Sequence, residues 1–120
     1  MTQEQIVKGN RVIADSPFIS DSHKKTIEVL SRTGEENLFY EGAKFHSSWE
    51  WIMPVVEAIE ALKEVDAHVS INHTCCDIYT FLKGSSQVDT LISERADTKI
   101  LAVFTAVVAF IEWYNLNRKG

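Results

Sequence analysis

The segment 98–115 constrains the fold most, because the helix that it predicts is apolar on almost every side. One stripe at helical spacing consists of Ile100, Val103, Phe104, Val107, Ile111 and Tyr114. Leu101, Val108 and Phe110 fall outside that stripe. A helix that is apolar nearly all round must be covered on more than one side. We therefore expect it to lie between a sheet and the helix predicted over residues 48–64, or to be covered in part by a second copy of the chain.

A second strong helix is predicted over residues 48–64. Its apolar stripe consists of Trp49, Ile52, Met53, Val56, Ile59 and Leu62. Ser47 or Ser48 is the natural N-cap of this helix. Pro54 removes a backbone donor and its ring meets the carbonyl of Glu50, at a cost of about 3 kcal/mol unless the helix bends. We expect a kink at Pro54 or an irregular first turn.

Residues 67–82, between these two helices, have the alternating pattern of β-strands. Val69 and Ile71 precede Asn72-His73, which are plausible turn residues. In the segment that follows the turn, Cys76, Ile78 and Thr80 alternate with Cys75, Asp77, Tyr79 and Phe81. This pattern predicts a β-hairpin. Residues 87–92 are a candidate third strand, which would help because a lone hairpin is only marginally stable in water.

The N-terminal third of the chain gives weaker signals. Thr2 and Gln5 form a capping-box pattern that predicts a helix over residues 2–14. Residues 22–33 fit either a helix, capped by Asp21 or Ser22 and ended by Gly34, or a strand, and the sequence leaves both open.

Residues 38–40 carry a leucine and two aromatic side chains between charged neighbours. Their simplest interpretation is a short buried connection. Together with the other segments, they predict an α+β fold in one small globular domain over residues 1–120. Two long helices pack against one face of a small antiparallel sheet of two to three strands, and an N-terminal helix covers an edge or end.

The charge balance bears on possible partners. Lys and Arg total 12 and Asp and Glu total 17, so the formal net charge is −5. General nucleic-acid binding requires a basic surface that displaces counterions, and this balance runs the other way. We expect no general nucleic-acid binding.

The compartment follows from the cysteines and from the apolar segments. The two cysteines, Cys75 and Cys76, are adjacent, which is unlike a secreted disulfide scaffold. No secretory leader pattern opens the chain. The apolar run from Ile100 to Ile111 would rise roughly 18 Å as a helix, short of a bilayer core of ~30 Å. We expect a cytoplasmic protein with no membrane segment.

Two long stretches carry a resemblance to a known group of proteins. Residues 44–60 read KFHSSWEWIMPVVEAIE and residues 98–115 read TKILAVFTAVVAFIEWYN. With Asn10–Asp15, they resemble a family of small phage and prophage (mobile-element) proteins without an assigned activity. The resemblance implies a phage or mobile-element origin, with the host cell cytosol as the setting. It implies no cofactor and no catalytic residues.

The residues that could carry chemistry have simpler structural roles. Cys75, Cys76, His73 and His68 lie within nine residues. Adjacent strand residues point to opposite faces, so both thiols cannot easily bind one metal ion, and we expect neither a metal nor a cofactor. His46 beside Ser47 and Ser48 is better explained as a loop histidine before capping serines than as part of a catalytic triad. His46, His73 and Cys76 remain weak candidates should a polar site exist.

Aromatic side chains at two helix ends are the candidate interaction patch: Trp49, Trp51, Trp113, Tyr114 and Phe110. If the two long helices run antiparallel, these rings meet in one cluster. A buried core is the alternative, since large rings bury much area in a small domain. Trp51 and Trp113 lie off the main stripes, where an exposed pair would mark a contact surface.

Three functions follow from these features. The preferred one is a non-enzymatic accessory protein that acts by protein–protein contact, with a homodimer through the 98–115 helix as one form of it. The second is a small-ligand binder of nucleotide-like compounds, or a counter-defence protein, with a pocket lined by Trp49, Tyr79 or Trp113. The third is a small enzyme with a site at His46, His73 or Cys76.

Overall fold

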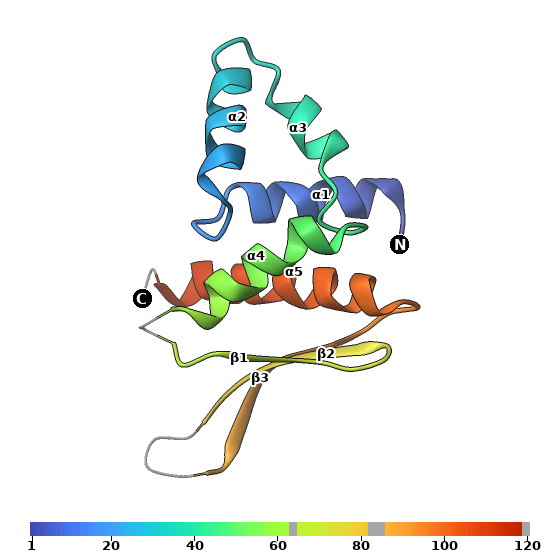
Figure 1. Cartoon of the computed structure of the whole chain (residues 1–120), viewed down its shortest axis with the longest axis vertical. Coiled ribbons are helices and arrows are strands. Elements are labelled where there is room, and N and C mark those ends of the chain that lie inside the picture. The colour runs from blue at the N-terminus through green and yellow to red at the C-terminus, as the bar shows by residue number, and fades with distance from the viewer. Residues whose placement is uncertain (63–64, 82–85, 119–120) are drawn as a thin grey trace.

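The structure is a computed structural model that describes residues 1–62, 65–81 and 86–118. Over those residues the chain forms five helices and a three-stranded antiparallel sheet, which confirms the α+β fold (Figure 1). In chain order the elements are α1 (Gln3–Ala14), α2 (Asp21–Ser31), α3 (Glu36–Gly42), α4 (Trp49–Glu60), β1 (His68–Ile71), β2 (Cys75–Phe81), β3 (Val88–Arg95) and α5 (Lys99–Arg118).

The sheet has the order β1-β2-β3, so the predicted hairpin and the third strand are both confirmed. The amide of Asn72 donates to the carbonyl of Cys75 (2.8 Å) and closes the β1–β2 turn. Between β2 and β3, Ile78 lies opposite Ile92 and Tyr79 lies opposite Thr90. One residue of β3, at position 91, is therefore extra and forms a β-bulge.

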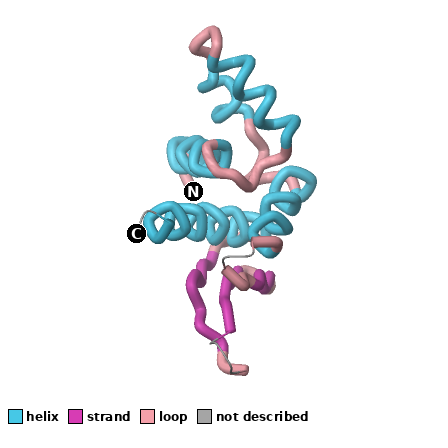
Figure 2. Tube along the Cα trace, turned by 90° about the vertical axis from the view of Figure 1, so that its left-hand side faces the viewer, coloured by secondary structure: helices cyan, strands magenta, loops and turns pink. Residues whose placement is uncertain are grey.

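Helix α5 is the centre of the molecule. It packs against β2 and β3 on one side and against α1 and α4 on others, while α2 and α3 sit beyond α1 (Figures 1 and 2). Its fully buried residues are Ala102, Val103, Phe104, Ala106, Val107, Phe110 and Ile111. Thr98 caps it by accepting from the amide of Leu101 (3.3 Å). The sheet and the 48–64 helix cover α5 as expected, whereas the cover that α1 provides was not predicted.

Two details of the predicted architecture differ in the structure. Helix α4 has 12 residues, as α1 does, and α5 has 20, so α5 is the one long helix among the described elements. Helix α1 packs on α5 from the side opposite the sheet and does not cover a sheet edge (Figure 1). The reason is that α5 is apolar on both sides and needs a second cover.

Helix α4 begins and ends inside its predicted range. Ser48 is the N-cap residue, although its side chain makes no capping hydrogen bond. The amides of Trp51 and Ile52 both donate to the carbonyl of Ser48 (3.1 Å each), so the first turn includes a tighter, 3₁₀-type bond. Pro54 lies inside the helix. The predicted continuation over residues 63 and 64 lies outside the described residues.

The ambiguous segment 22–33 is helical in the structure. Ser20, not Asp21 or Ser22, is the N-cap of α2, and its hydroxyl accepts from the amide of His23 (3.4 Å). Gly34 follows this helix with φ of 74°, a left-handed conformation that glycine adopts without strain. The helix, not the strand, is therefore the correct alternative.

Residues 38–40 are also helical, so the expected buried connection is wrong. They belong to α3, in which Phe39 and Tyr40 are buried and Leu38 is 58% exposed. One turn of helix turns two rings towards the core and leaves the third apolar side chain in solvent.

Asn10 ties α1 to the end of α3. Its side chain is fully buried, and its Nδ2 donates to the carbonyls of Tyr40 (3.0 Å) and Ala43 (3.2 Å). The Tyr40 hydroxyl donates to Asp15 (3.2 Å) and adds a second link between the same elements. These bonds hold the α2–α3 region against the rest of the helical layer.

Gly9 lets α1 approach α5 closely, and Gly9→Ala is therefore expected to destabilise the fold. A Cβ at this position would lie 2.5 Å from Phe104 Cζ and 2.9 Å from its Cε2. Phe104 is buried and cannot swing away. The overpacking cost of about 1–3 kcal/mol exceeds the gain of about 1 kcal/mol in helix propensity. We expect a net loss of about 1–2 kcal/mol by urea unfolding.

The matched control is Gly42→Ala at the end of α3. A Cβ at Gly42 would meet nothing within 4 Å. This variant is expected to be neutral or slightly stabilising, because only the unfolded-state entropy changes. Equal effects at the two positions would contradict the close α1–α5 contact.

Candidate interaction surfaces

Two members of the predicted aromatic patch are core residues. Phe110 is completely buried and Tyr114 is 9% exposed. Phe18 packs against both rings, with centroid distances of 6.2 Å to Phe110 and 5.4 Å to Tyr114. Trp113 is half-buried beside Phe110 (5.5 Å). Phe110 and Tyr114 therefore contribute packing and not contact surface.

Trp51 of α4 belongs to a different group of rings. Trp51 stacks on His23 of α2 (4.3 Å, 24°) and meets Phe45 edge to face (5.2 Å). Trp49 is 40% exposed. Trp51 and Phe110 thus belong to two separate groups of ring contacts. The single cluster expected from antiparallel helices is not found, because rings of α2 and α3 pack against Trp51 instead.

The three weak candidates for a polar site lie in different environments. His46 is half-buried before α4, with its ring 5.9 Å from Phe104. His73 is exposed in the β1–β2 turn. Cys76 is fully buried on the side of β2 that faces α5, and burial together with Asp77 raises the pKa of its thiol to about 12. Cys76 is therefore a protonated packing residue at neutral pH.

The two thiols lie on opposite faces of β2, as the alternation predicts. Cys75 is half-buried on the outer face, and its Sγ donates to Asp77 (3.5 Å). Among the described residues, no three His, Cys, Asp or Glu side chains gather as metal ligands.

The burial of Cys76 predicts unequal thiol reactivity. At about pH 8 the thiol reagent DTNB should modify Cys75 in the folded protein, whereas Cys76 should react only after unfolding. The Cys75→Ser variant should then show no fast reaction in the native state, and the Cys76→Ser variant should keep it. Fast modification of Cys76 in the folded protein would contradict its burial.

Two half-buried histidines predict a loss of stability in acid. Desolvation lowers the pKa of both His23 and His46 below the usual 6.5. The unfolded chain then takes up protons first, so the free energy of unfolding falls as the pH drops through about 6.5 and levels off below the folded-state pKa. Urea titrations between about pH 8 and pH 5 should show this fall for the wild type. The His23→Phe variant, which keeps a ring against Trp51, should show a smaller fall; superimposable pH profiles would refute the prediction.

The face of the sheet turned away from α5 carries an exposed aromatic cluster. His68 pairs with Tyr79 across β1 and β2, and Phe81 pairs with Val88 across β2 and β3. The ring of His68 stacks on Tyr79 (5.4 Å) and meets Phe81 edge to face (5.1 Å). Phe81 is 41% exposed and Val88 is 51% exposed. We call these four residues the outer-face cluster.

No described helix covers this side of the sheet: the described helices all lie on the side of α5 (Figures 1 and 2). The same face becomes polar beyond the cluster, where Asp77 accepts from the Ser93 hydroxyl (2.6 Å). Asp66 lies 3.3 Å from His68 Nε2 at the apolar end. The alternation after the turn already separates Tyr79 and Phe81 from Cys76 and Ile78, which was the signal in the sequence for this face.

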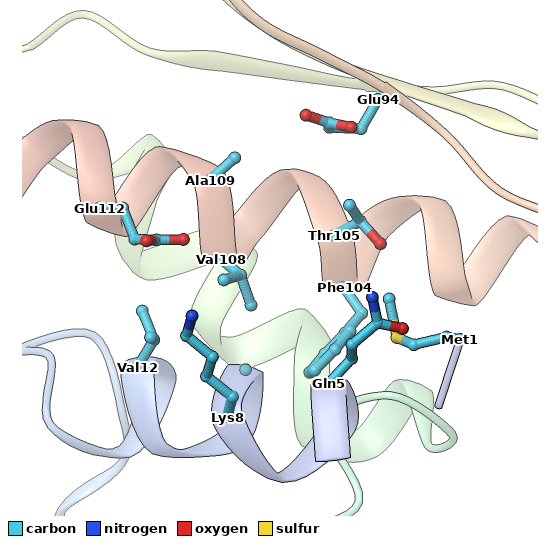
Figure 3. A pocket seen from close by; sticks show the side chains of 11 residues that line it. Met1, Gln5, Lys8, Val12, Glu94, Phe104, Thr105, Val108, Ala109 and Glu112 are labelled. Carbon is cyan, nitrogen blue, oxygen red and sulfur yellow. The ribbon is translucent and has the colours of Figure 1, made fainter. Parts of the chain in front are cut away.

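A second surface feature is a groove between α1 and α5, with a volume of about 290 Å³ (Figure 3). Its floor consists of Gly9, Val12, Phe104, Val108 and Ala109. Its rim carries Gln5, Lys8, Glu94 and Glu112 from three elements. A hollow of about 260 Å³ adjoins it and shares Met1, Gln5 and Thr105. Lys8 and Glu112 face each other across the groove from α1 and α5 (Figure 3).

Helix α5 is also long and apolar enough to cross a membrane by length and composition alone. The sequence argument considered only a run of twelve residues, whereas the observed helix is longer. Its position between the sheet and α1 is that of a core helix.

Neither a family model, nor a curated protein, nor a solved structure matches the chain.

Proposed function

We propose that this protein acts by contact with another protein and not by catalysis, and that the outer-face cluster is the contact surface. The observation that carries the proposal is the exposed Phe81–Val88 pair on a sheet face that no described helix covers. Soluble monomers rarely expose large contiguous apolar patches, and such patches mark interaction sites. Aromatic side chains are enriched in the buried centres of interfaces.

The rings of the cluster are held in place before any partner binds. His68 is fixed between the ring of Tyr79 and the carboxylate of Asp66. Tyr79 and Phe81 also meet edge to face (5.8 Å). Side chains that are already ordered lose less entropy on binding, which favours a contact role for this face.

The two alternatives have less support. An enzyme would need a nucleophile or base in a polar cleft. Cys76 is buried and protonated, His46 is half-buried before α4, and His73 is exposed in the β1–β2 turn. A nucleotide-like ligand would need a pocket lined by Trp49, Tyr79 or Trp113. The hollows that the described residues form beside α1 contain none of these three.

The setting belongs to the same proposal. We place the contact in the cytosol of a host cell and in a phage or mobile-element context, on the resemblance of residues 44–60 and 98–115. A homodimer is one form of the contact. Since α5 is covered by four elements, the outer-face cluster offers a second copy more exposed apolar surface than α5 does.

The test compares the wild type with the Phe81→Ser/Val88→Ser double variant. The control is Val29→Ser, which removes another exposed apolar side chain from α2. We expect a dimer, or a specific protein co-purified from host cells, with the wild type and the control, and its loss with the double variant. Light scattering after size exclusion measures the dimer. A monomer whose co-purified proteins are the same for all three chains would refute the proposal.

A further inference from the structure

We infer that α2 is a cover that opens by local unfolding of residues 20–34 while the other described elements stay folded. Opening exposes the rings beneath it, Phe39, Phe45 and Trp51. The inference does not depend on the outer-face cluster, because α2 lies at the end of the molecule away from the sheet (Figures 1 and 2).

Few side chains hold α2 against the rest of the protein. None of its 11 residues is buried, whereas each of the other described helices contributes buried residues to the core. His23, Ile27 and Leu30 are half-buried, and the other residues of α2 are exposed. A helix of this length is only marginally stable in water by itself, so α2 depends on these three contacts.

The polar bonds of α2 do not tie it to another element. In the part of the chain that the structure describes, its side-chain hydrogen bonds and its ion pair stay within residues 20–33. Such bonds stabilise the helix itself and are lost with it. Opening of α2 therefore breaks no side-chain hydrogen bond of the core.

The segments on both sides of α2 are anchored. Before it, Phe18 and Ile19 are buried, and the ring of Phe18 packs against Tyr114 of α5 (5.4 Å). After it, the two hydrogen bonds from Asn10 fix the end of α3. Segments with few buried contacts open at a lower free energy than the core does. Opening is therefore confined to the stretch between these anchors.

The surface beneath α2 consists of aromatic rings. His23 lies 5.6 Å from Phe39, 5.8 Å from Phe45 and 4.3 Å from Trp51, measured between ring centroids. Phe39 and Phe45 are buried in the closed protein. When α2 opens, the sides of the three rings that His23 touches become accessible to solvent. The open form thus displays an apolar surface that the closed form covers.

Hydrogen exchange of the full-length, ¹⁵N-labelled protein measures the opening. We expect the amides of α2 to exchange at least about tenfold faster than the slowest amides of α5, with a weaker dependence on urea. Equal rates and equal urea dependence in the two helices would show that α2 opens only with the whole fold, which would overturn the inference.

Two capping variants separate local from global opening. Ser20→Ala removes the hydroxyl that accepts from the amide of His23, and it should speed exchange in α2 about fivefold and leave the slowest amides of α5 unchanged. Thr98→Ala removes the corresponding cap of α5 and should leave exchange in α2 unchanged. If the two variants speed exchange in α2 equally, the opening is global and the inference is wrong.

A third experiment tests whether the rings become exposed. The chain has three tryptophans, so the Trp49→Phe/Trp113→Phe background leaves Trp51 as the fluorescent reporter. In this background Ile27→Ser/Leu30→Ser removes two of the three contacts of α2. We expect red-shifted emission and stronger acrylamide quenching of Trp51, while the amide resonances of α5 and the sheet keep their positions.

Val29→Ser in the same background is the matched control, because Val29 is an exposed residue of α2. Its Trp51 emission and quenching should equal those of the background. Loss of the native α5 resonances in the Ile27→Ser/Leu30→Ser variant would show that α2 does not open separately. Loss of the α2 resonances without a change at Trp51 would show that α2 does not cover the rings. Either result overturns the inference.

Discussion

Replacing Phe110 with alanine is expected to lower the free energy of unfolding by about 3–5 kcal/mol, the range for truncating a fully buried phenylalanine. Phe110 is completely buried and packs against Phe18, Trp113 and Tyr114. Two contributions add up in this loss. Alanine buries less apolar area on folding than phenylalanine does, and a cavity remains in the folded protein. Small domains have a total stability of about 5–15 kcal/mol, so the variant should be partly unfolded at moderate temperature. Urea unfolding followed by circular dichroism measures the effect.

Phe81→Ala provides the control for this prediction. The same chemical change at a 41% exposed position should cost less than about 1 kcal/mol, since little area is buried there. The comparison thus distinguishes a phenylalanine of the core from one on the surface. If Phe110→Ala were as mild as Phe81→Ala, then Phe110 would belong to a surface, as the sequence pattern suggested.

Asn10→Ala is expected to cost about 2–3 kcal/mol, because two buried hydrogen bonds disappear together. The side-chain amide donates to Tyr40 and Ala43, which lie some thirty residues further along the chain. Without these bonds the end of α3 loses its link to α1. Relative to the wild type, hydrogen exchange in the variant should speed up more in α2 and α3 than in α5. The global stability should also be lower.

Two further substitutions make this prediction specific. Asn10→Asp keeps the shape but has no donor and places a carboxylate against two carbonyl oxygens, so it should destabilise more than Asn10→Ala. Asn37→Ala, at an exposed position of α3, should change the stability by less than about 0.5 kcal/mol. An order in which Asn10→Asp is the mildest of the three would show that the amide does not bond as described.

The parts of the fold that could be predicted from the sequence are those with a repeating pattern. The stripe from Ile100 to Tyr114 indicates α5, and the alternation around Cys76 and Ile78 indicates the hairpin. The capping box of Thr2 and Gln5 is present in the structure with both of its hydrogen bonds. Such patterns report burial directly, because one face of each element must be covered.

The parts that could not be predicted depend on partners distant in the sequence. Helices α2 and α3 are short, and α2 has no fully buried residue, so its pattern fits a strand equally well. The position of α1 depends on Gly9 meeting Phe104, which are 95 positions apart. Trp51 lies off the stripe of α4, and the ring that covers it is His23 of α2. Interaction surfaces are what remains after such contacts form. The alternation along β2 indicates which side chains share the outer face, but only the structure shows that no described helix covers that face.

The extra residue at position 91 has a consequence for solubility. β3 lies at the border of the sheet, where unpaired amides and carbonyls could template the addition of another strand and begin an aggregate. The irregularity reverses the side-chain alternation halfway along this border, so that an incoming strand in regular register would match one half and mismatch the other. The bulge thus disfavours the addition of a further strand at the β3 edge, next to the exposed outer-face cluster.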